Sequence, residues 1–245
     1  MELWGITDCG KVRRQNQDVF RIYSDEDNGV AAFVVCDGMG GVRAGNIASA
    51  LASDVFMEQI NGHLASAWDL GDVAVKMANA VYAANKVVYE KSISSDEYHG
   101  MGTTLTAVIS TVNGEVIVNV GDSRGYYITP SCIKQITKDH TVVEDMVTRG
   151  DITRAEARRH PKKNLITRAV GTSYEEEPDV FFLNLATGEH ILLCSDGFSN
   201  LVMDSEVLFE LQQGNSIRES CEKLVEMALS RGAPDNVTAV IFKKG

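Results

Sequence analysis

The sequence contains little cysteine and no long apolar segment. Its 245 residues include five cysteines, which are scattered and form no C-x-x-C pair. This pattern predicts neither a disulfide framework nor a zinc site, and it fits a reducing cytoplasm. No apolar run approaches the roughly 20 residues that span a bilayer, and the N-terminus lacks the pattern of a signal peptide. We therefore expect a soluble cytoplasmic protein without a membrane anchor.

Basic residues are also scarce. The 23 lysines and arginines are outnumbered by 34 aspartates and glutamates, which gives a formal net charge of −11. Nucleic acids and anionic membranes are bound by basic surfaces, so neither is expected as the main partner. The apolar fraction of 44% is ordinary, and the length allows one large domain or two small ones with a substantial core.

What the sequence does contain is a grouped pattern of strands and helices. Strands are expected at residues 3–7 and 19–24 and in a run that ends at Asp37, and two helices follow, at 46–60 and from 72 onward. A second group of strands (103–110, 115–120, 125–129, 132–136) is close enough to predict one antiparallel meander. Strands at 180–185 and 190–194, two helices at 204–212 and from 216, and a last strand at 237–242 follow. Ser216 and Glu219 predict a capping box at the start of the second of these helices. Grouping of this kind predicts an α+β sandwich of sheets with helices outside, not a βαβ alternation.

Some polar residues have a simple structural interpretation. Asp72 is expected to cap the second helix, and His63 is expected to be a surface or hydrogen-bonded histidine and not a ligand. Asp25 and Asp27 resemble the start of an EF-hand, but the required glycine and glutamate are out of register, which favours a hairpin turn.

The stretch 139–171 is polar and charged. Gly150 is a plausible helix C-cap, and Thr153 and Glu156 form a capping box, so we expect a flap subdomain with short helices on the sheet edge. A solvated charged face and a docking surface both remain open for its basic residues, which are Arg149, Arg154, Arg158, Arg159, Lys162 and Lys163.

Four aspartates stand out by their position next to predicted strands. Asp37, Asp122 and Asp196 each follow a buried strand directly, and Asp235 directly precedes one. Because strand ends in a packed sheet lie close together, folding could gather all four at one rim. Their repulsion would then raise their pKa values unless cations were present.

An all-oxygen site of this kind suits Mg²⁺ or Mn²⁺ better than Zn²⁺ or Cu²⁺. Two such ions about 3.5–4 Å apart can activate a water and hold a phosphoryl oxygen for in-line attack. A nucleotide-binding loop is the alternative for Gly38, Gly40 and Gly41, but the third glycine of G-x-G-x-x-G would have to be at Arg43. A crossover parallel sheet would support that alternative.

Several short motifs, taken together and in this order, resemble those of the metal-dependent protein phosphatases, the type 2C serine/threonine family, in a compact bacterial form. The resemblance covers essentially the whole chain. The motifs are Arg13-x-x-Asn16-x-Asp18, Asp37-Gly38-Met39-Gly40-Gly41, Met101-Gly102-Thr103-Thr104, Gly121-Asp122-Ser123-Arg124, Asp139-His140, Arg168-Ala169-Val170-Gly171, Ser195-Asp196-Gly197 and Asp235-Asn236.

The resemblance implies a role for each site residue. Asp37 would bridge two ions, the Gly38 carbonyl would join one of them, and Asp196 with Asp235 would hold the other. Asp122 and Asp196 match the positions that bind a third, weaker metal in bacterial relatives. Arg13 would grip the substrate phosphate, for which a planar guanidinium is suited. Asp18 would order water from the outer shell, Asn16 would hold the local turn, and Thr103 and Thr104 would support the rim.

Two departures from the family pattern matter. Gln17 replaces a glutamate that many relatives carry, which removes one negative charge from the outer shell. Met39 stands where animal members have a histidine proposed to protonate the leaving oxygen, and metal-bound water is the substitute expected here.

The implied fold is a four-layer α-β-β-α sandwich with a flap at about 139–171, as one catalytic domain over 1–245. The implied activity is metal-dependent hydrolysis of phosphoserine and phosphothreonine in proteins, with two Mn²⁺ or Mg²⁺ ions and a cognate serine/threonine kinase as the opposing partner. A monomer is expected. The alternative is a catalytically weak phosphoprotein-binding module on the same fold.

Overall fold

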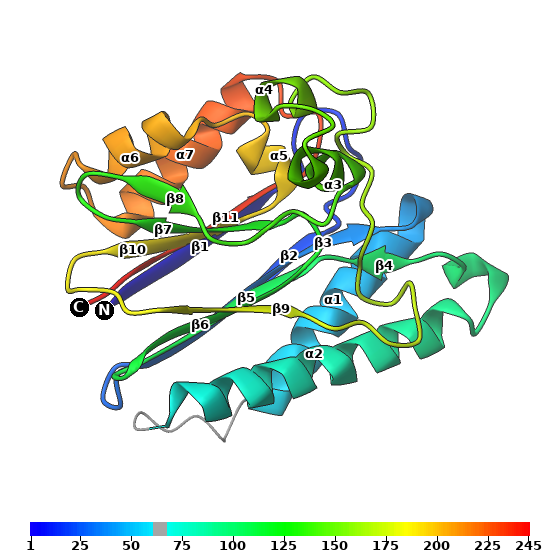
Figure 1. Cartoon of the computed structure of the whole chain (residues 1–245), viewed down its shortest axis with the longest axis horizontal. Coiled ribbons are helices and arrows are strands. Elements are labelled where there is room, and N and C mark those ends of the chain that lie inside the picture. Colours follow the sequence, from blue (N-terminus) through cyan, green and yellow to red (C-terminus); the bar gives the residue numbers. More distant parts are fainter. Residues whose placement is uncertain (61–67) are drawn as a thin grey trace.

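Two antiparallel sheets lie face to face, and helices cover both outer faces (Figure 1). The structure, a computed structural model, describes residues 1–60 and 68–245. This is the predicted four-layer α-β-β-α sandwich, and every strand pair in the described part of the chain is antiparallel. The crossover parallel sheet that a nucleotide-binding loop would need is not found among those strands.

The first sheet joins the two ends of the chain. In it the first strand pairs with the last, so the termini lie side by side (Figure 1). Its strands, in spatial order, are β1 (Glu2–Asp8), β11 (Val237–Lys243), β10 (His190–Cys194), β7 (Arg124–Ile128) and β8 (Ile133–Gln135).

The second sheet is more deeply buried than the first. Its two central strands run through β-branched and other apolar residues that are almost completely inaccessible, because helices cover one face and the other sheet covers the opposite face. The spatial order is β2 (Asp18–Asp25), β3 (Val30–Met39), β5 (Leu105–Thr111), β6 (Gly114–Val120) and β9 (Asp179–Leu183), and the short β4 (Gly102–Thr103) pairs with the end of β3.

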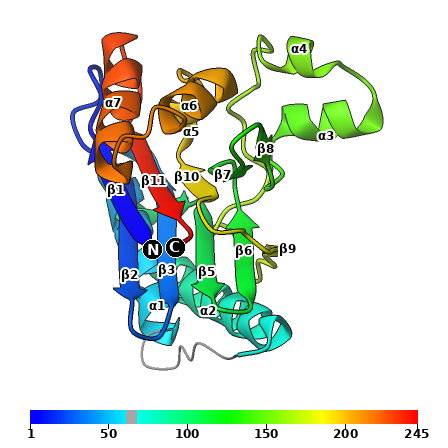
Figure 2. The same ribbon diagram turned by 90° about the vertical axis from the view of Figure 1, so that its left-hand side faces the viewer.

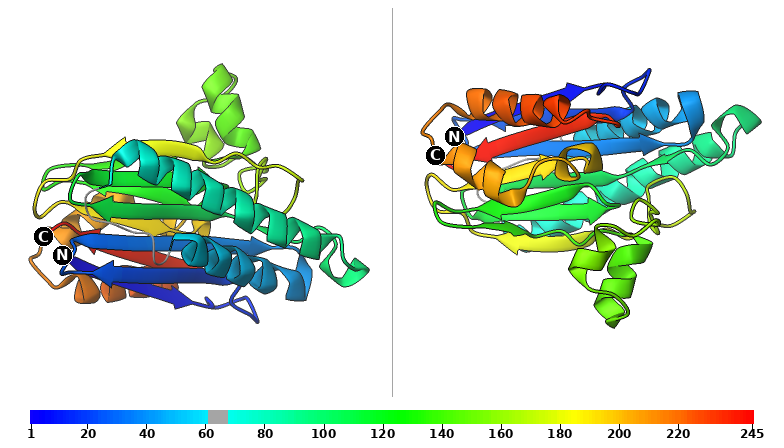
Figure 3. Two further views of the ribbon diagram at one scale, coloured as in Figure 1. Left: turned by 90° about the horizontal axis from the view of Figure 1, so that it is seen from below. Right: turned by 90° about the horizontal axis from the view of Figure 1, so that it is seen from above.

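Two long helices, α1 (Gly41–Ile60) and α2 (Leu70–Ser92), lie across the second sheet (Figure 3). Their apolar faces form one core cluster with that sheet, and α2 contributes Val73, Met77 and Val81 to it. On the other side α5 (Asp196–Ser199), α6 (Asp204–Leu211) and α7 (Ile217–Ser230) cover the first sheet in a second cluster. A third cluster fills the space between the sheets and includes stacked Phe33 and Phe242.

The predicted flap stands beside the sandwich (Figure 2). It contains α3 (Val142–Arg149) and α4 (Arg154–Ala157), and a 3₁₀ turn (Asp96–Tyr98) follows α2 elsewhere. Gly150 ends α3 with a φ of 80°, and Thr153 and Glu156 form the capping box of α4, as predicted. The capping box predicted at Ser216 and Glu219 is also present, at the start of α7.

Four local expectations were wrong. The cap of α2 is Asp69, whose side chain accepts a hydrogen bond from Gly71 N at 2.8 Å, and not Asp72. The first helix begins at Gly41, five residues before the predicted start at Asn46. β3 continues two residues past Asp37, because β4 pairs with this extension.

The predicted single meander is also wrong. The chain leaves the second sheet after β6 and enters the first at β7, so the four strands are divided between two sheets. The turn at residues 121–123 makes this crossing.

Asp25 lies in a hairpin turn, as favoured, where Asn28 donates hydrogen bonds to its carboxylate. The expectation for His63 lies outside the described residues. Within the described part of the chain, no helix is both long and apolar enough to cross a membrane.

Candidate functional site

Asp37 is fixed in position by the strand beside it. The backbone of Asp37 is hydrogen-bonded by both threonines of the neighbouring segment: Thr104 Oγ1 accepts from Asp37 N at 2.8 Å, and Thr103 Oγ1 donates to Asp37 O at 2.9 Å. Thr104 N also donates to Asp37 O at 2.9 Å. These threonines therefore support the backbone that carries the carboxylate, as predicted.

Asp122 lies in the turn that carries the chain from one sheet to the other. The Thr104 hydroxyl is 2.7 Å from that of Ser123, which joins this turn to the segment that holds Asp37. On its other side the turn is held by His140, whose Nδ1 accepts from Gly121 N at 3.0 Å. Asp122 itself is buried, with 6% of its surface exposed.

Asp196 and Asp235 are brought together by a close backbone approach. Asp196 begins α5 directly after β10, and Asp235 immediately precedes β11, the neighbouring strand. A Cβ added at Gly197 would lie 2.0 Å from Asn236 O, so only glycine allows these two segments to come this close. Asn200 Nδ2 donates to Asp196 Oδ2 at 3.3 Å.

The aspartates are close enough to perturb one another. Burial raises the pKa of Asp37 well above its usual range, and the charges of Asp18, Asp196, Asp122 and Asp235 add to this rise. Burial, together with the charge of Asp196, raises the pKa of Asp122 to about 8. The four predicted rim aspartates therefore lie within electrostatic reach of one another.

Asp18 is a fifth carboxylate at this rim. It pairs in register with Asp37 across β2 and β3 and is 4% exposed. Its Oδ2 accepts from Thr238 Oγ1 at 2.7 Å, whereas the buried Oδ1 has no hydrogen-bond partner in the described part of the chain. Burial raises the pKa of Asp18 to about 6. An unsatisfied buried oxygen is costly unless another group, such as a water or a cation, is bound there.

Arg13 reaches the rim from the loop between β1 and β2. Its Nη2 donates to Asp235 Oδ2 at 2.7 Å, although the side chain is 52% exposed. The loop is held by Asn236, whose Nδ2 donates to Cys9 O at 2.9 Å and Gln15 O at 3.0 Å and whose Oδ1 accepts from Gln17 N at 2.8 Å. Asn16 accepts from Asp18 N and so holds the local turn, as predicted.

Cations from two further elements act on the rim. Arg124 makes a multidentate ion pair with Asp139, with Nε 3.0 Å from both carboxylate oxygens and Nη2 2.7 Å from Oδ2. The charges of Arg124 and of Lys163, a flap residue, oppose the burial that raises the pKa of Asp196. The flap therefore lies within electrostatic reach of the rim.

The donor set fits a hard divalent cation. Carboxylates and backbone carbonyls are the ligands that Mg²⁺ and Mn²⁺ prefer, and the raised pKa values and the unpartnered Asp18 Oδ1 indicate negative charge without compensation. In the described residues no three His, Cys, Asp or Glu side chains are already gathered like the ligands of a bound ion. The ion pair with Arg13 engages the carboxylate of Asp235, so ligation would require that carboxylate to turn.

Some site residues had no assigned role in the sequence interpretation. Asn236 and Arg124 belong to motifs without an assigned function for these two residues, Lys163 is one charge among many, and Asn200 belongs to no predicted motif. The contacts of Asn236, Arg124 and Lys163 join residues that are well separated in the sequence, so local spacing does not indicate them. Asn200 has its partner nearby, at Asp196. Only the position of Asn236 next to Asp235 was a signal.

Comparison with known proteins gives one consistent result. The model of the family Protein phosphatase 2C matches residues 9–235. Serine/threonine phosphatase stp of Listeria monocytogenes serotype 4b is 34% identical over 242 residues, which cover 97% of this chain and 94% of that protein. The crystal structure of serine/threonine phosphatase Stp1 from Staphylococcus aureus is similar with a TM-score of 0.92 at 34% identity, covering 99% and 94% of the two chains. The catalytic domain of the phosphatase PstP, solved with two manganese ions, gives 0.82 at 37% identity, covering 98% and 96%.

Proposed function

Because the chain belongs to the protein phosphatase 2C family, we propose that it removes phosphate from phosphoserine and phosphothreonine side chains of proteins. The observation that carries this proposal is the rim itself. Asp37, Asp122, Asp196 and Asp235 come from four separate segments and act on one another electrostatically, and an exposed arginine lies on their open side. Such a site combines a cation-binding surface with a group that recognises phosphate.

The resident cofactor is Mn²⁺ or Mg²⁺, with two ions in the core site. Asp37 and the Gly38 carbonyl would hold one ion, Asp196 and Asp235 the other, and Asp37 would contact both. Asp122 with Asp196 would provide a third, weaker site. When bound, the two ions activate water and neutralise charge on the phosphoryl oxygens. The presence of two manganese ions in the PstP catalytic domain supports this assignment.

The chain's own residues bind the substrate and position the water. Arg13 would bind two phosphoryl oxygens through its guanidinium after leaving Asp235, and Asn236 would keep the Arg13 loop against the rim. Asp18 lies behind Asp37 with one free acceptor oxygen, so it would orient water there. Met39 cannot donate a proton, so the leaving oxygen must take its proton from solvent or from water held at the rim.

A hydrolysis assay tests the proposed function. Purified protein is incubated with an aryl phosphate and with a phosphothreonine peptide in the presence of Mn²⁺, with EDTA as the control. We expect hydrolysis of both substrates and its loss on chelation. Protein that binds Mn²⁺ in calorimetry and hydrolyses neither substrate would instead be the phosphoprotein-binding module of the alternative interpretation.

The physiological setting is also part of this proposal. Residues 1–245 would act as one catalytic domain and as a monomer, with a serine/threonine kinase that phosphorylates the same substrates as the opposing partner. All five cysteines are free, which supports a reducing cytoplasmic location. The net charge of −11 supports phosphoproteins over nucleic acid or membrane as the main partners.

A further inference from the structure

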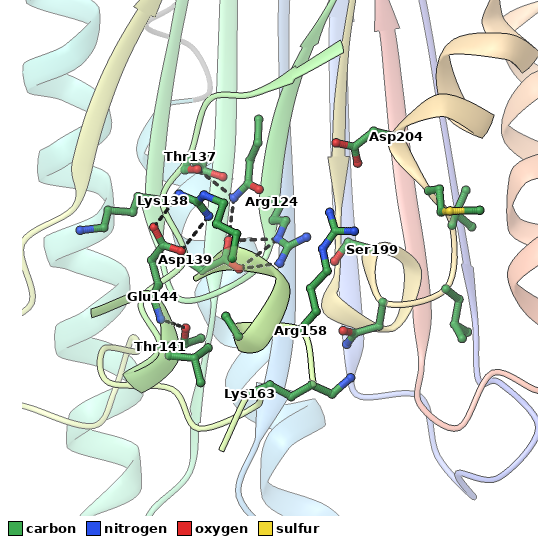
Figure 4. A pocket seen from close by; sticks show the side chains of 18 of the residues that line it. Arg124, Thr137, Lys138, Asp139, Thr141, Glu144, Arg158, Lys163, Ser199 and Asp204 are labelled. Atoms are coloured by element: carbon green, nitrogen blue, oxygen red, sulfur yellow. Dashed lines mark hydrogen bonds and ion pairs between the residues drawn. The ribbon is translucent and has the colours of Figure 1, made fainter. Parts of the chain in front are cut away.

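A polar cavity lies between the flap and the segment that joins α5 to α6 (Figure 4). Its volume is about 920 Å³, which is large enough to admit several side chains of a peptide. One wall comes from β7, β8 and the loop that follows, another from α3 and α4, and the third from residues 199–205. Among the described residues of the lining there is no aromatic side chain, so these residues offer no aromatic surface on which a nucleotide base could stack.

Half of the charged side chains in the lining are paired with one another. Arg124 is held by Asp139, and Arg154 makes two hydrogen bonds of 3.0 Å to the carboxylate of Glu144. These pairs neutralise each other and contribute little net field.

Two flap cations in the lining are not paired. In the described part of the chain, Arg158 and Lys163 take part in no ion pair or side-chain hydrogen bond, and both side chains extend toward the wall that contains Ser199 (Figure 4). Lys138 points away from them, and Asp204 is the one unpaired carboxylate among the described lining residues. The cavity is therefore a locally positive site in a strongly acidic protein.

The cavity lies next to the rim and is linked to it through one hydrogen bond. Asn200, a lining residue, donates to Asp196 Oδ2 at 3.3 Å, and the charge of Lys163 acts on the same carboxylate. A peptide whose phosphoresidue is at the rim would consequently place its neighbouring residues beside Arg158 and Lys163.

We propose that this cavity binds an acidic side chain of the phosphoprotein substrate, a few residues away from the phosphoresidue, through Arg158 and Lys163. The proposal rests on the phosphatase function above and adds a substrate preference to it. A guanidinium can bond both oxygens of a carboxylate, and an ammonium beside it adds a second cation. The structure also divides the basic flap residues: Arg154 has an internal partner, whereas Arg159 and Lys162 are exposed and lie outside the lining.

Matched phosphothreonine peptides test the preference. Three peptides of equal length carry glutamate, glutamine or lysine at the positions two to four residues on either side of the phosphothreonine. For the wild-type protein with Mn²⁺ we expect kcat/KM to be about tenfold higher for the glutamate peptide than for the glutamine peptide, which corresponds to about 1.4 kcal/mol. The preference should shrink as ionic strength rises, because the cavity is open to solvent.

Substitutions then locate the preference in the cavity. Arg158→Gln and Lys163→Gln should each reduce the ratio of the two kcat/KM values, and the double substitution should bring it to about one. Arg158→Glu should favour the lysine peptide. The matched controls, Arg159→Gln and Lys162→Gln, remove the same charge from the same flap outside the cavity and should keep the wild-type ratio.

The outcomes separate this inference from the proposed function. If no peptide and no aryl phosphate is hydrolysed with Mn²⁺, the phosphatase function itself fails. If all peptides are hydrolysed equally well, the enzyme stands and the acidic subsite is wrong. The assignment to Arg158 and Lys163 would also be overturned if the acidic preference survives the double substitution. It would be overturned as well if the control variants lose the preference to the same extent as the cavity variants.

Discussion

At the scale of single residues, Arg13 and Asp235 hold each other in the absence of a cation. The 2.7 Å ion pair joins the residue proposed to bind phosphate to a residue proposed to bind metal. Cation binding at Asp235 must therefore compete with Arg13, and it would release the guanidinium for substrate. The pair is half exposed, so its own contribution to stability is small.

Two substitutions distinguish these roles. Asp196→Asn should lose measurable Mn²⁺ affinity and nearly all turnover, because it removes a charged ligand. Arg13→Ala should raise KM about tenfold or more while Mn²⁺ affinity stays equal or increases, since the competing cation is gone. Calorimetric titration measures the Mn²⁺ affinity, and steady-state kinetics on an aryl phosphate measure KM and turnover. Equal loss of metal affinity in the two variants would contradict the assigned roles.

The sequence predicted the rim aspartates because each has a local signal, a carboxylate at the end of an apolar run. It could not predict what Asn236 and Lys163 do, because their contacts join segments that only the fold brings together. The same limit applies to the flap cations. Arg154 and Arg158 look alike in the sequence, yet Arg154 is bound to Glu144 and Arg158 is not.

At the scale of elements, the end of β3 is pressed against the start of α1. A Cβ on Gly38 would lie 2.1 Å from Gly45 O and 2.8 Å from Gln17 O, which no real side chain could occupy. The carbonyl of Gly38 is a proposed ligand, so the close approach of strand and helix sets its direction. Gly38 and Gly45 allow the backbone of β3 to pack directly on the backbone of α1.

Gly38→Ala should consequently separate β3 from α1 and displace the rim. We expect a loss of several °C in Tm together with weaker Mn²⁺ binding, measured by thermal unfolding and calorimetry. Gly150→Ala is the matched control, because it introduces a side chain at a φ of 80° in open space in the flap. That variant should cost about 1–2 kcal/mol of stability without affecting Mn²⁺ affinity. Unchanged metal binding in Gly38→Ala would show that this approach does not position the rim.

Element types were predicted better than element partners. The alternation of apolar residues identified the strands, and capping residues identified α3, α4 and α7 within a residue or two. The meander prediction failed because close spacing along the chain does not say which sheet a strand joins. The crossing between β6 and β7 depends on which faces must be buried between the two sheets, and this is a property of the whole sandwich.

At the scale of the whole molecule, the metal-free protein carries an electrostatic penalty that depends on pH. The pKa of Asp18 is raised to about 6 and that of Asp122 to about 8, against 3.8 for an ordinary aspartate. Between pH 3.8 and these raised pKa values, the folded state binds more protons than the unfolded state. The free energy of unfolding is therefore highest at low pH and falls as pH rises from about 4 to about 8.

Metal-stripped protein should therefore lose unfolding free energy, on the order of a few kcal/mol, between pH 5 and pH 8. Urea unfolding at three or four pH values measures this loss. Saturating Mn²⁺ should reverse the trend, because the cation binds the deprotonated carboxylates and its stabilisation grows with pH. In Asp122→Asn the decline above pH 6 should be weaker. A metal-stripped protein that is as stable at pH 8 as at pH 5 would argue against a crowded anionic rim.

The pairing of β1 with β11 also determines when the first sheet can form during synthesis. β1 has its strand partner in β11, and Asp235 and Asn236 precede β11 directly. A nascent chain therefore lacks both a neighbour for β1 and the anchor of its Arg13 loop until residues 235–243 have emerged. The second sheet and its two helices involve shorter sequence separations and can assemble earlier. Activity should consequently arise only after β11 has paired with β1, so a nascent chain that still lacks β11 should not act on phosphoproteins.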